Sequence, residues 1–175
     1  MGSLAIPFAS LRSKVKVIAT ASRPESAQWC LDRGADLTVN YKDLKGELAK
    51  HDIRQVDFIL CLNDTDGHWE AISDLIAPMG HICTIVENEH PLDMNKLKLK
   101  SAALHWELMY TRSMFTTPDI AEQGEILKQV AALVDEGKVQ TTLSETLSGL
   151  TVESIEAAHA KVLDGHMQGK VVVAF

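Results

Sequence analysis

Residues 14–33 carry the pattern that most restricts how this chain can fold. The segment reads KVKVIATASRPESAQWCLDR and passes from a β-branched apolar run through small residues into a helix start. The apolar run at 15–21 suits a short parallel strand buried on both faces. Pro24 suits the first position of a helix, and Gly34 suits the position just past its end. The segment therefore predicts a strand, a polar turn at the carboxyl end of that strand, and a helix at 24–33.

The same alternation continues along the whole chain. Further strands are expected at 36–40, 56–62, 81–86, 101–110 and 169–173, with an extended segment at 141–147. Helices are expected at 2–12 (disturbed or started late by Pro7), 44–51, 69–76, 118–136 and 151–164, with a turn at 78–80 and a loop at 87–99. Strands alternating with helices of about ten residues indicate an α/β fold with a parallel sheet covered on both faces.

Composition excludes several classes of function. A chain of 175 residues suits one domain or slightly more, and its net charge of −7 disfavours non-specific binding to nucleic acid or to a membrane surface. No apolar run is long enough to span a membrane, and we see no signal peptide. The three cysteines lie far apart without a C-x-x-C pair, which predicts reduced core thiols in a cytoplasmic protein.

Ser22 and Arg23 stand at the carboxyl end of the first predicted strand, where open α/β sheets bind their ligands. An NAD-binding fold would place an acidic residue here for the ribose hydroxyls, whereas a cation beside a small hydroxyl suits a ribose that carries a phosphate. The alternative is an exposed loop arginine that pairs with Glu25. From the residues alone the two interpretations are about equally supported.

Six motifs in order resemble one family along essentially the whole chain. They are KVIATASRPES, GAD-x-x-x-NYK, VDFILCL, APMGHI, HWELMYTRSMF and H-A-K-x-x-x-G-x-x-x-GKVVV. The series resembles the zinc-type alcohol dehydrogenase-like, quinone oxidoreductase-related branch of the medium-chain dehydrogenase/reductase superfamily. The resemblance implies a Rossmann-like doubly wound parallel sheet, NADPH as hydride donor, and reduction of carbonyls or activated double bonds.

The resemblance also implies a domain organisation. In the family a catalytic domain precedes the cofactor domain, so we expect residues 1–140 to be a truncated NAD(P)-binding Rossmann domain that lacks its first strand and most of its glycine-rich loop. Gly2 would be the last glycine of that loop. Residues 141–175 are expected to pack on the missing catalytic domain. The lost strand is normally central, so we expect self-association or local rearrangement to cover the gap.

Four further positions match cofactor-binding positions of the family. Tyr41 would lie near the same phosphate, Asn63 would lie near the nicotinamide ribose, and Ile85 and Val86 would lie under the nicotinamide ring. Each also has an ordinary structural interpretation: an exposed loop tyrosine, a turn residue, and strand core.

The substrate side would carry Trp106 and Met109, in an aromatic-rich strand that the family also places near its dimer edge. A buried strand with one hydrogen-bonded histidine is an equally good interpretation. The histidines lack the spacing of metal ligands, so we expect no metal site in this chain.

Three functional hypotheses remain open at this point. The first is the cofactor-binding portion of an NADPH-dependent oxidoreductase, inactive alone. The full-length family would act on a small carbonyl or quinone, and this chain would form a homo-oligomer. The second is a non-enzymatic truncated Rossmann-like module for dimerisation or interaction. The third is a flavodoxin-like or methyltransferase-like α/β domain, which periodicity alone does not exclude.

Overall fold

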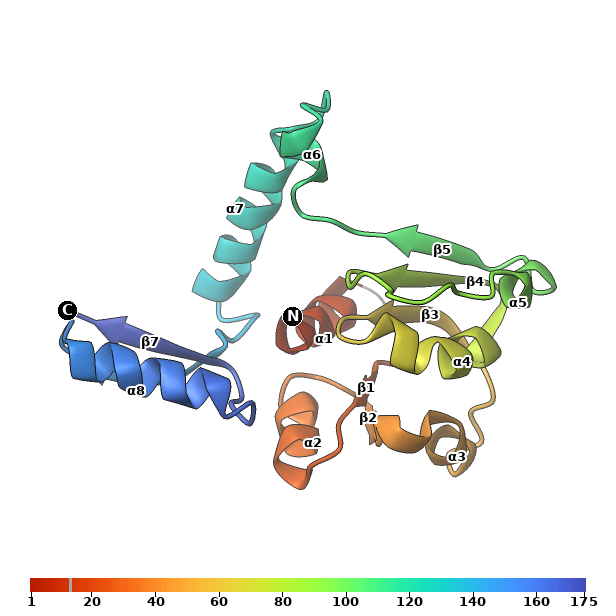
Figure 1. Cartoon of the computed structure of the whole chain (residues 1–175), viewed down its shortest axis with the longest axis horizontal. Helices are drawn as coiled ribbons and strands as arrows, with labels where there is room; N and C mark the ends of the chain where they lie inside the picture. Colours follow the sequence, from red (N-terminus) through yellow and green to blue (C-terminus); the bar gives the residue numbers. More distant parts are fainter. Residues whose placement is uncertain (13) are drawn as a thin grey trace. The chain divides into compact units, whose positions relative to one another are not determined.

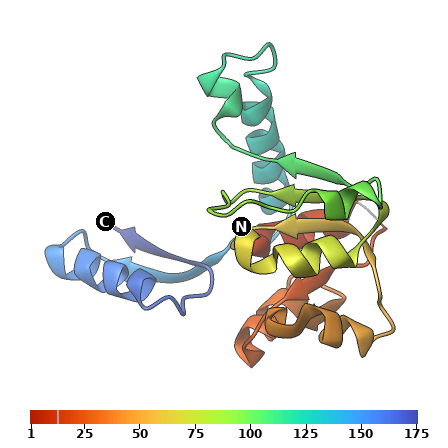
Figure 2. The same ribbon diagram turned by 45° about the vertical axis from the view of Figure 1, so that its right-hand side comes forward.

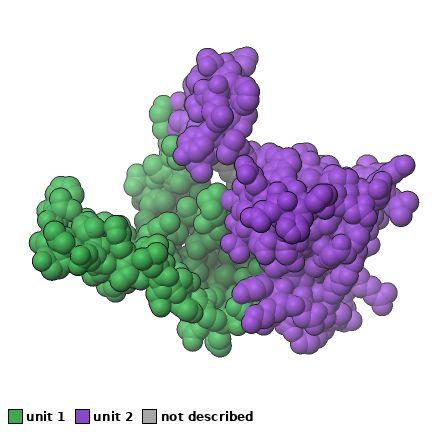
Figure 3. Space-filling model, in the orientation of Figure 1, with its two compact units in different colours: residues 1–38, 127–175 green, residues 39–126 purple. Residues whose placement is uncertain are grey.

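The computed structural model describes residues 1–12 and 14–175, which separate into two compact units. Unit 1 comprises residues 1–38 and 127–175, and unit 2 comprises residues 39–126 (Figure 3). Each unit is described below by itself. No described helix is both long and apolar enough to cross a membrane.

Unit 2 is built on a parallel three-stranded sheet in the order β3 (Val56–Cys61), β4 (Ile76–Thr84) and β5 (Ala103–Trp106). Helix α4 (Thr65–Leu75) connects β3 to β4 and lies along one face of the sheet (Figures 1 and 2). The core between them is apolar and almost fully buried: Cys61, Trp69, Ile72, Ile76, Ile82 and Leu97. This packing confirms the expected α/β character of the unit.

The opposite face of the same sheet is exposed within unit 2. Phe58 and Leu60, which alternate with the core residues of β3, are 66% and 50% exposed. A stacked row crosses this face, with the His81 ring centroid 5.8 Å from that of Phe58 and 5.4 Å from that of His105. Unit 2 by itself therefore covers one face of a sheet that the alternation predicts to be covered on both.

Strand β4 begins at Ile76 and ends at Thr84, so the expected strand at 81–86 is confirmed for 81–84, and the expected turn at 78–80 is an irregularity within the strand. Ile76 pairs with Val56 and His81 pairs with Phe58, so residues 78–80 bulge out of the ladder within the strand. Pro78 has no N–H to donate, and the amide of Met79 is instead bonded to the carbonyl of Lys100 at 2.8 Å.

Four short helical segments complete unit 2: η1 (Tyr41–Asp43), α3 (Leu44–Ala49), α5 (Asn95–Lys98) and α6 (Thr111–Met114). The turn α5 lies in the segment expected to be a loop, where Leu97 enters the core. The expected strand at 101–110 ends at Trp106, so its second half was wrong.

The first part of unit 1 contains α1 (Gly2–Arg12), β1 (Ile18–Thr20), α2 (Pro24–Leu31) and β2 (Leu37–Val39), whose last residue begins unit 2. Helix α1 runs through Pro7 without a break, contrary to expectation. Ile6, Ala19 and Ala35 form a small buried cluster. Strand β1 is shorter than the predicted run. Leu31, at the end of α2, is 40% exposed.

The second part of unit 1 contains the larger part of α7 (Glu122–Asp135), followed by β6 (Leu143–Ser148), α8 (Val152–Leu163) and β7 (Lys170–Ala174). Strands β6 and β7 are parallel, and α8 connects them. Helix α7 begins four residues after Pro118, where the sequence predicted its start, and has no buried residue.

The described strands form three separate sheets, β1–β2, β3–β4–β5 and β6–β7, and the last two are parallel throughout. This agrees with an α/β fold of parallel strands. The predicted absence of a first strand and the predicted domain boundary at residue 140 stay predictions.

Candidate functional site

Arg23 occupies the start of α2, at the turn that follows β1. It is the N-cap residue, with φ −120° and ψ 145°, and Pro24 takes the first helical position as predicted. The first amides of a helix lack intrahelical partners and point toward whatever lies before the helix. The turn thus combines a cationic side chain with a helix N-terminus. In the described part of the chain Arg23 forms no ion pair with Glu25, the partner of the alternative interpretation.

A loop near the C-terminus contacts this turn, and sequence reasoning did not place it there. Nη2 of Arg23 donates to the carbonyl oxygen of His166 at 3.3 Å, and Nε2 of Gln168 donates to Oγ of Ser26 at 3.1 Å. The only signal for these residues was their place inside the H-A-K-x-x-x-G-x-x-x-G motif, which carries no information about a contact with α2.

Tyr41 lies in unit 2, in the short η1 turn that follows β2. The Asn40 side chain accepts from the amide of Lys42 at 3.0 Å, and this bond shapes the turn. The Tyr41 ring is 39% exposed and meets the His68 ring edge-on at 5.9 Å. A common phosphate site of Tyr41 with the β1–α2 turn stays a prediction.

The carboxyl ends of β3 and β4 are joined by a buried hydroxyl pair. Oγ1 of Thr65 lies 2.6 Å from Oγ1 of Thr84 and donates to the carbonyl of Val86 at 2.7 Å. The amide of Ile85 is bonded to the carbonyl of Cys61 at 3.4 Å. Both threonines are almost fully buried. The segment that holds Ile85 and Val86 is therefore fixed beside the residues that follow β3.

Asp64 and Asp66 have structural partners at the same edge. Asp64 is the N-cap of α4 and accepts from the amide of Gly67 at 2.8 Å. Asp66 accepts from the amides of Glu89 and His90 at 2.6 and 3.2 Å and so anchors the segment after β4. Sequence reasoning missed this anchor, because an acidic residue in the first turn of a helix is common and does not indicate a distant partner.

Trp106 and Met109 lie in an exposed apolar segment of unit 2. Trp106 is the last residue of β5, and Met109 lies beyond the strand, where the sequence predicted strand to continue. Their exposed fractions are 51% and 58%. Apolar neighbours as far as residue 115 are exposed too: Leu108, Tyr110, Met114 and Phe115.

Gly2 is the first residue of α1. Its correspondence to the last glycine of a phosphate-binding loop stays a prediction.

The described residues offer little basis for a metal site or for a reactive cysteine. There, no three His, Cys, Asp or Glu side chains come together in an arrangement that could hold a metal ion. All three cysteines are free. Burial raises the pKa of Cys30 and of Cys83, and for Cys83 the nearby Glu107 adds to the rise. Both groups therefore stay thiols at neutral pH.

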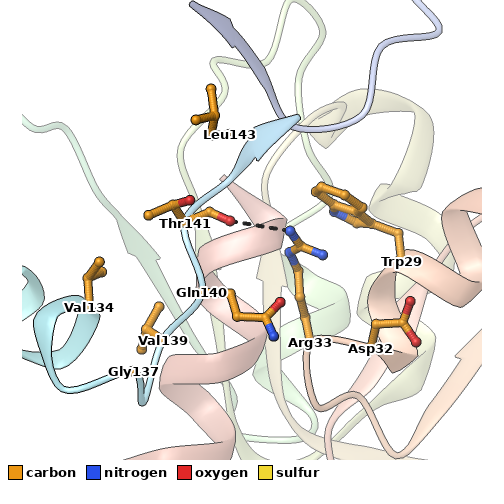
Figure 4. A pocket seen from close by; sticks show the side chains of 9 residues that line it. All are labelled: Trp29, Asp32, Arg33, Val134, Gly137, Val139, Gln140, Thr141 and Leu143. Carbon is orange, nitrogen blue, oxygen red and sulfur yellow. Dashed lines mark hydrogen bonds between the residues drawn. The ribbon is translucent and has the colours of Figure 1, made fainter. Parts of the chain in front are cut away.

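A separate hollow in unit 1 was not predicted (Figure 4). It lies between the end of α2 and the segment that leads into β6. The guanidinium carbon of Arg33 lies 3.2 Å from the centre of the Trp29 ring, and Nη2 of Arg33 donates to the carbonyl of Thr141 at 3.4 Å (Figure 4). Arg33 thus ties residues 137–143 to α2 within the unit through the Trp29 stacking and the Thr141 bond, while its Nε is buried without a hydrogen-bond partner among the described residues.

Comparisons with known proteins agree with the motifs along the chain. A family model described as zinc-binding dehydrogenase matches residues 33–173. A zinc-type alcohol dehydrogenase-like protein of Staphylococcus aureus is 37% identical over 174 residues, which are 99% of this chain and 52% of the relative. The corresponding protein of Staphylococcus epidermidis is 38% identical, with the same coverage. The chain thus spans about half the length of the curated relatives it matches.

Solved structures give the same result. A zinc-dependent alcohol dehydrogenase protein from Rhizobium etli superposes with a TM-score of 0.88 at 40% identity, over 99% of this chain and 51% of that one. The quinone oxidoreductase of Escherichia coli, solved in complex with NADPH, shares the fold with a TM-score of 0.75 at 19% identity, over 99% and 53%. The family model covers well over half of the chain, so the chain belongs to the zinc-binding dehydrogenase family, as its motifs predicted.

Proposed function

We propose that this chain is the NADPH-binding portion of an oxidoreductase. The observation that carries the proposal is the β1–α2 turn, where Arg23 is the N-cap of a helix and follows a small hydroxyl residue, Ser22. A guanidinium forms strong, charge-assisted bonds with phosphate oxygens, and a helix N-terminus adds favourable potential for an anion. These donors fit a 2′-phosphate on the adenosine ribose.

Family membership and fold support the same cofactor. Structures with the same fold include the NADPH complexes of the Escherichia coli and Thermus thermophilus quinone oxidoreductases, with TM-scores of 0.75 and 0.74. We therefore assign the nicotinamide end to the carboxyl ends of β3 and β4. There Ile85 and Val86 would contact the ring, and Asn63 would contact its ribose. Tyr41 would contribute on the phosphate side.

The bound dinucleotide supplies hydride to an acceptor, and the protein supplies position and electrostatics. For this chain we propose cofactor binding without catalysis of its own. Reduction of a small carbonyl or quinone we assign to a protein of the relatives' full length, in which Trp106 and Met109 would face the substrate. Zinc has no place in this proposal, because the described residues offer no ligand set for it.

The test is a fluorescence titration of the chain with NADPH and with NADH. We expect NADPH to bind more tightly, and Arg23→Ala to weaken NADPH binding by roughly 10- to 100-fold, since a hydrogen bond to a charged group contributes about 1.5–3 kcal/mol. NADH binding should change little. Arg54→Ala removes the same charge from an exposed site in unit 2 and serves as the control. A wild-type preference for NADH would refute the phosphate assignment.

One observation favours a second candidate, a module for association. Six apolar side chains between residues 106 and 115 are at least half exposed, and clustered exposed apolar side chains mark interaction sites. If the chain binds neither dinucleotide but associates in sedimentation experiments, and Met109→Ser with Phe115→Ser abolishes that association, the module is the better assignment. We include homo-oligomer formation through this segment in the proposal.

A further inference from the structure

The loop between α8 and β7, residues 164–169, reaches the β1–α2 turn from the other end of the chain. We call it the C-terminal loop. It lies beside α2 in both views of unit 1 (Figures 1 and 2), and two hydrogen bonds join it to the turn and the helix. His166 accepts from the guanidinium of Arg23, and Gln168 donates to the hydroxyl of Ser26. Both bonds link residues more than 140 positions apart in the sequence.

The shape of this loop is restricted at both of its ends. Gly165 and Gly169 adopt φ values of +71° and +78°, which L side chains rarely adopt. A Cβ at Gly169 would also collide with the carbonyl oxygen of Thr142. The ring of His166 is bonded back to the carbonyl of Asp164 at 2.6 Å. The loop therefore presents the His166 carbonyl in a defined place.

We propose that the C-terminal loop positions Arg23 for the 2′-phosphate, and that Gln168 is a positioning residue for the preference for NADPH over NADH. This inference depends on the proposed function. An arginine has five N–H donors, and the His166 carbonyl uses one of them, so the rest stay available to a phosphate. Holding a long side chain in place before binding lowers the entropy lost on binding.

Gln168 is the anchor of this arrangement. Its amide is bonded to Ser26 in the first turn of α2, and that bond is partly buried. It therefore ties the loop to the same helix whose N-cap is Arg23. Without the anchor, the loop keeps its own shape but loses the side-chain bond that holds it, and with it the His166 carbonyl, against α2. The affinity for NADPH, whose 2′-phosphate would contact Arg23, is therefore reduced. The affinity for NADH, which has no such phosphate, is unchanged.

The experiment compares NADPH and NADH affinities of the wild-type chain and of Gln168→Ala. We expect NADPH binding to weaken roughly 2- to 10-fold, the cost of one mobile side chain, with NADH binding unchanged. Gln55→Ala, at an exposed glutamine of unit 2, is the matched control and should leave both affinities unchanged. In Arg23→Ala the Gln168→Ala change should have no further effect, because its target is absent.

The outcomes separate the two proposals. A wild-type chain without a preference for NADPH refutes the proposed function, and the role of Gln168 with it. A wild-type preference that Gln168→Ala leaves intact refutes only the positioning role. Equal weakening of both dinucleotides, with a lowered unfolding midpoint, shows that Gln168 supports the fold rather than Arg23, and also overturns the inference.

Discussion

The buried hydroxyl pair at the ends of β3 and β4 gives the sharpest prediction about stability. Thr65→Val keeps the shape of the side chain but removes its hydroxyl. Oγ1 of Thr65 is bonded to Thr84 at 2.6 Å and to the Val86 carbonyl at 2.7 Å, and the two threonine side chains are 2% and 0% exposed. Two buried bonds at 0.5–1.5 kcal/mol each predict a loss of about 1–3 kcal/mol in the free energy of unfolding.

Urea unfolding followed by tryptophan fluorescence measures this loss, since Trp69 is buried in the core of the same unit. Thr84→Val should cost a similar amount. The double variant should cost less than the sum of the two, because the Thr65–Thr84 bond is lost in each single variant and is therefore counted twice in that sum. A loss below about 0.5 kcal/mol for Thr65→Val, or strict additivity in the double variant, would refute the reasoning.

Two further predictions concern unit 1 and the segment before α7. Gly169→Ala should lower the thermal unfolding midpoint by several degrees, because the new Cβ would sit on a left-handed φ and collide with the Thr142 carbonyl. Gly124→Ala is the control. It lies at a helical site with open space around it and should not lower the midpoint. A hydrogen bond from Thr117 and then the guanidinium of Arg112 hold the pKa of Asp119 below its ordinary value. Such a depressed pKa stabilises the folded state above the unfolded-state pKa, and that contribution is lost as pH falls through the folded-state pKa. Thr117→Val should therefore raise the Asp119 pKa in an NMR titration, and an unchanged value would contradict the bond.

The predictable parts of the fold are those where local chemistry and tertiary packing agree. The start of α2 at Pro24 and the left-handed turns at Gly34 and Gly137 follow from proline and glycine stereochemistry, and the structure has both features. The apolar run of β3 predicts a strand regardless of its neighbours. These features need no knowledge of distant contacts.

The errors arise where a distant contact decides the structure. The segment at 78–80 looks like a turn because of its proline and glycine. It stays within β4 because Ile76 pairs with Val56 and the amide of Met79 finds the carbonyl of Lys100. Local patterns cannot distinguish such alternatives.

The same distinction applies to the candidate site. Arg23 could be proposed from the sequence because its residue type and its place after a strand are both local. Arg23 and His166 are 143 positions apart in the sequence, and no local sequence pattern predicts their contact. The flavodoxin-like and methyltransferase-like alternatives could likewise not be excluded by periodicity, and family membership now sets them aside.

The residues after β3 show how the structure narrows a predicted site. Three polar residues follow this strand, and any of them could serve a ligand by residue type. Asp64 is occupied in capping α4, and Thr65 is buried and bonded to the Val86 carbonyl. Asn63 is exposed, and its side chain has no hydrogen bond to any described residue. If a nicotinamide ribose binds at this edge, Asn63 is the side chain of the three that is not already engaged with a described residue, and Thr65 contributes by holding Val86 in place.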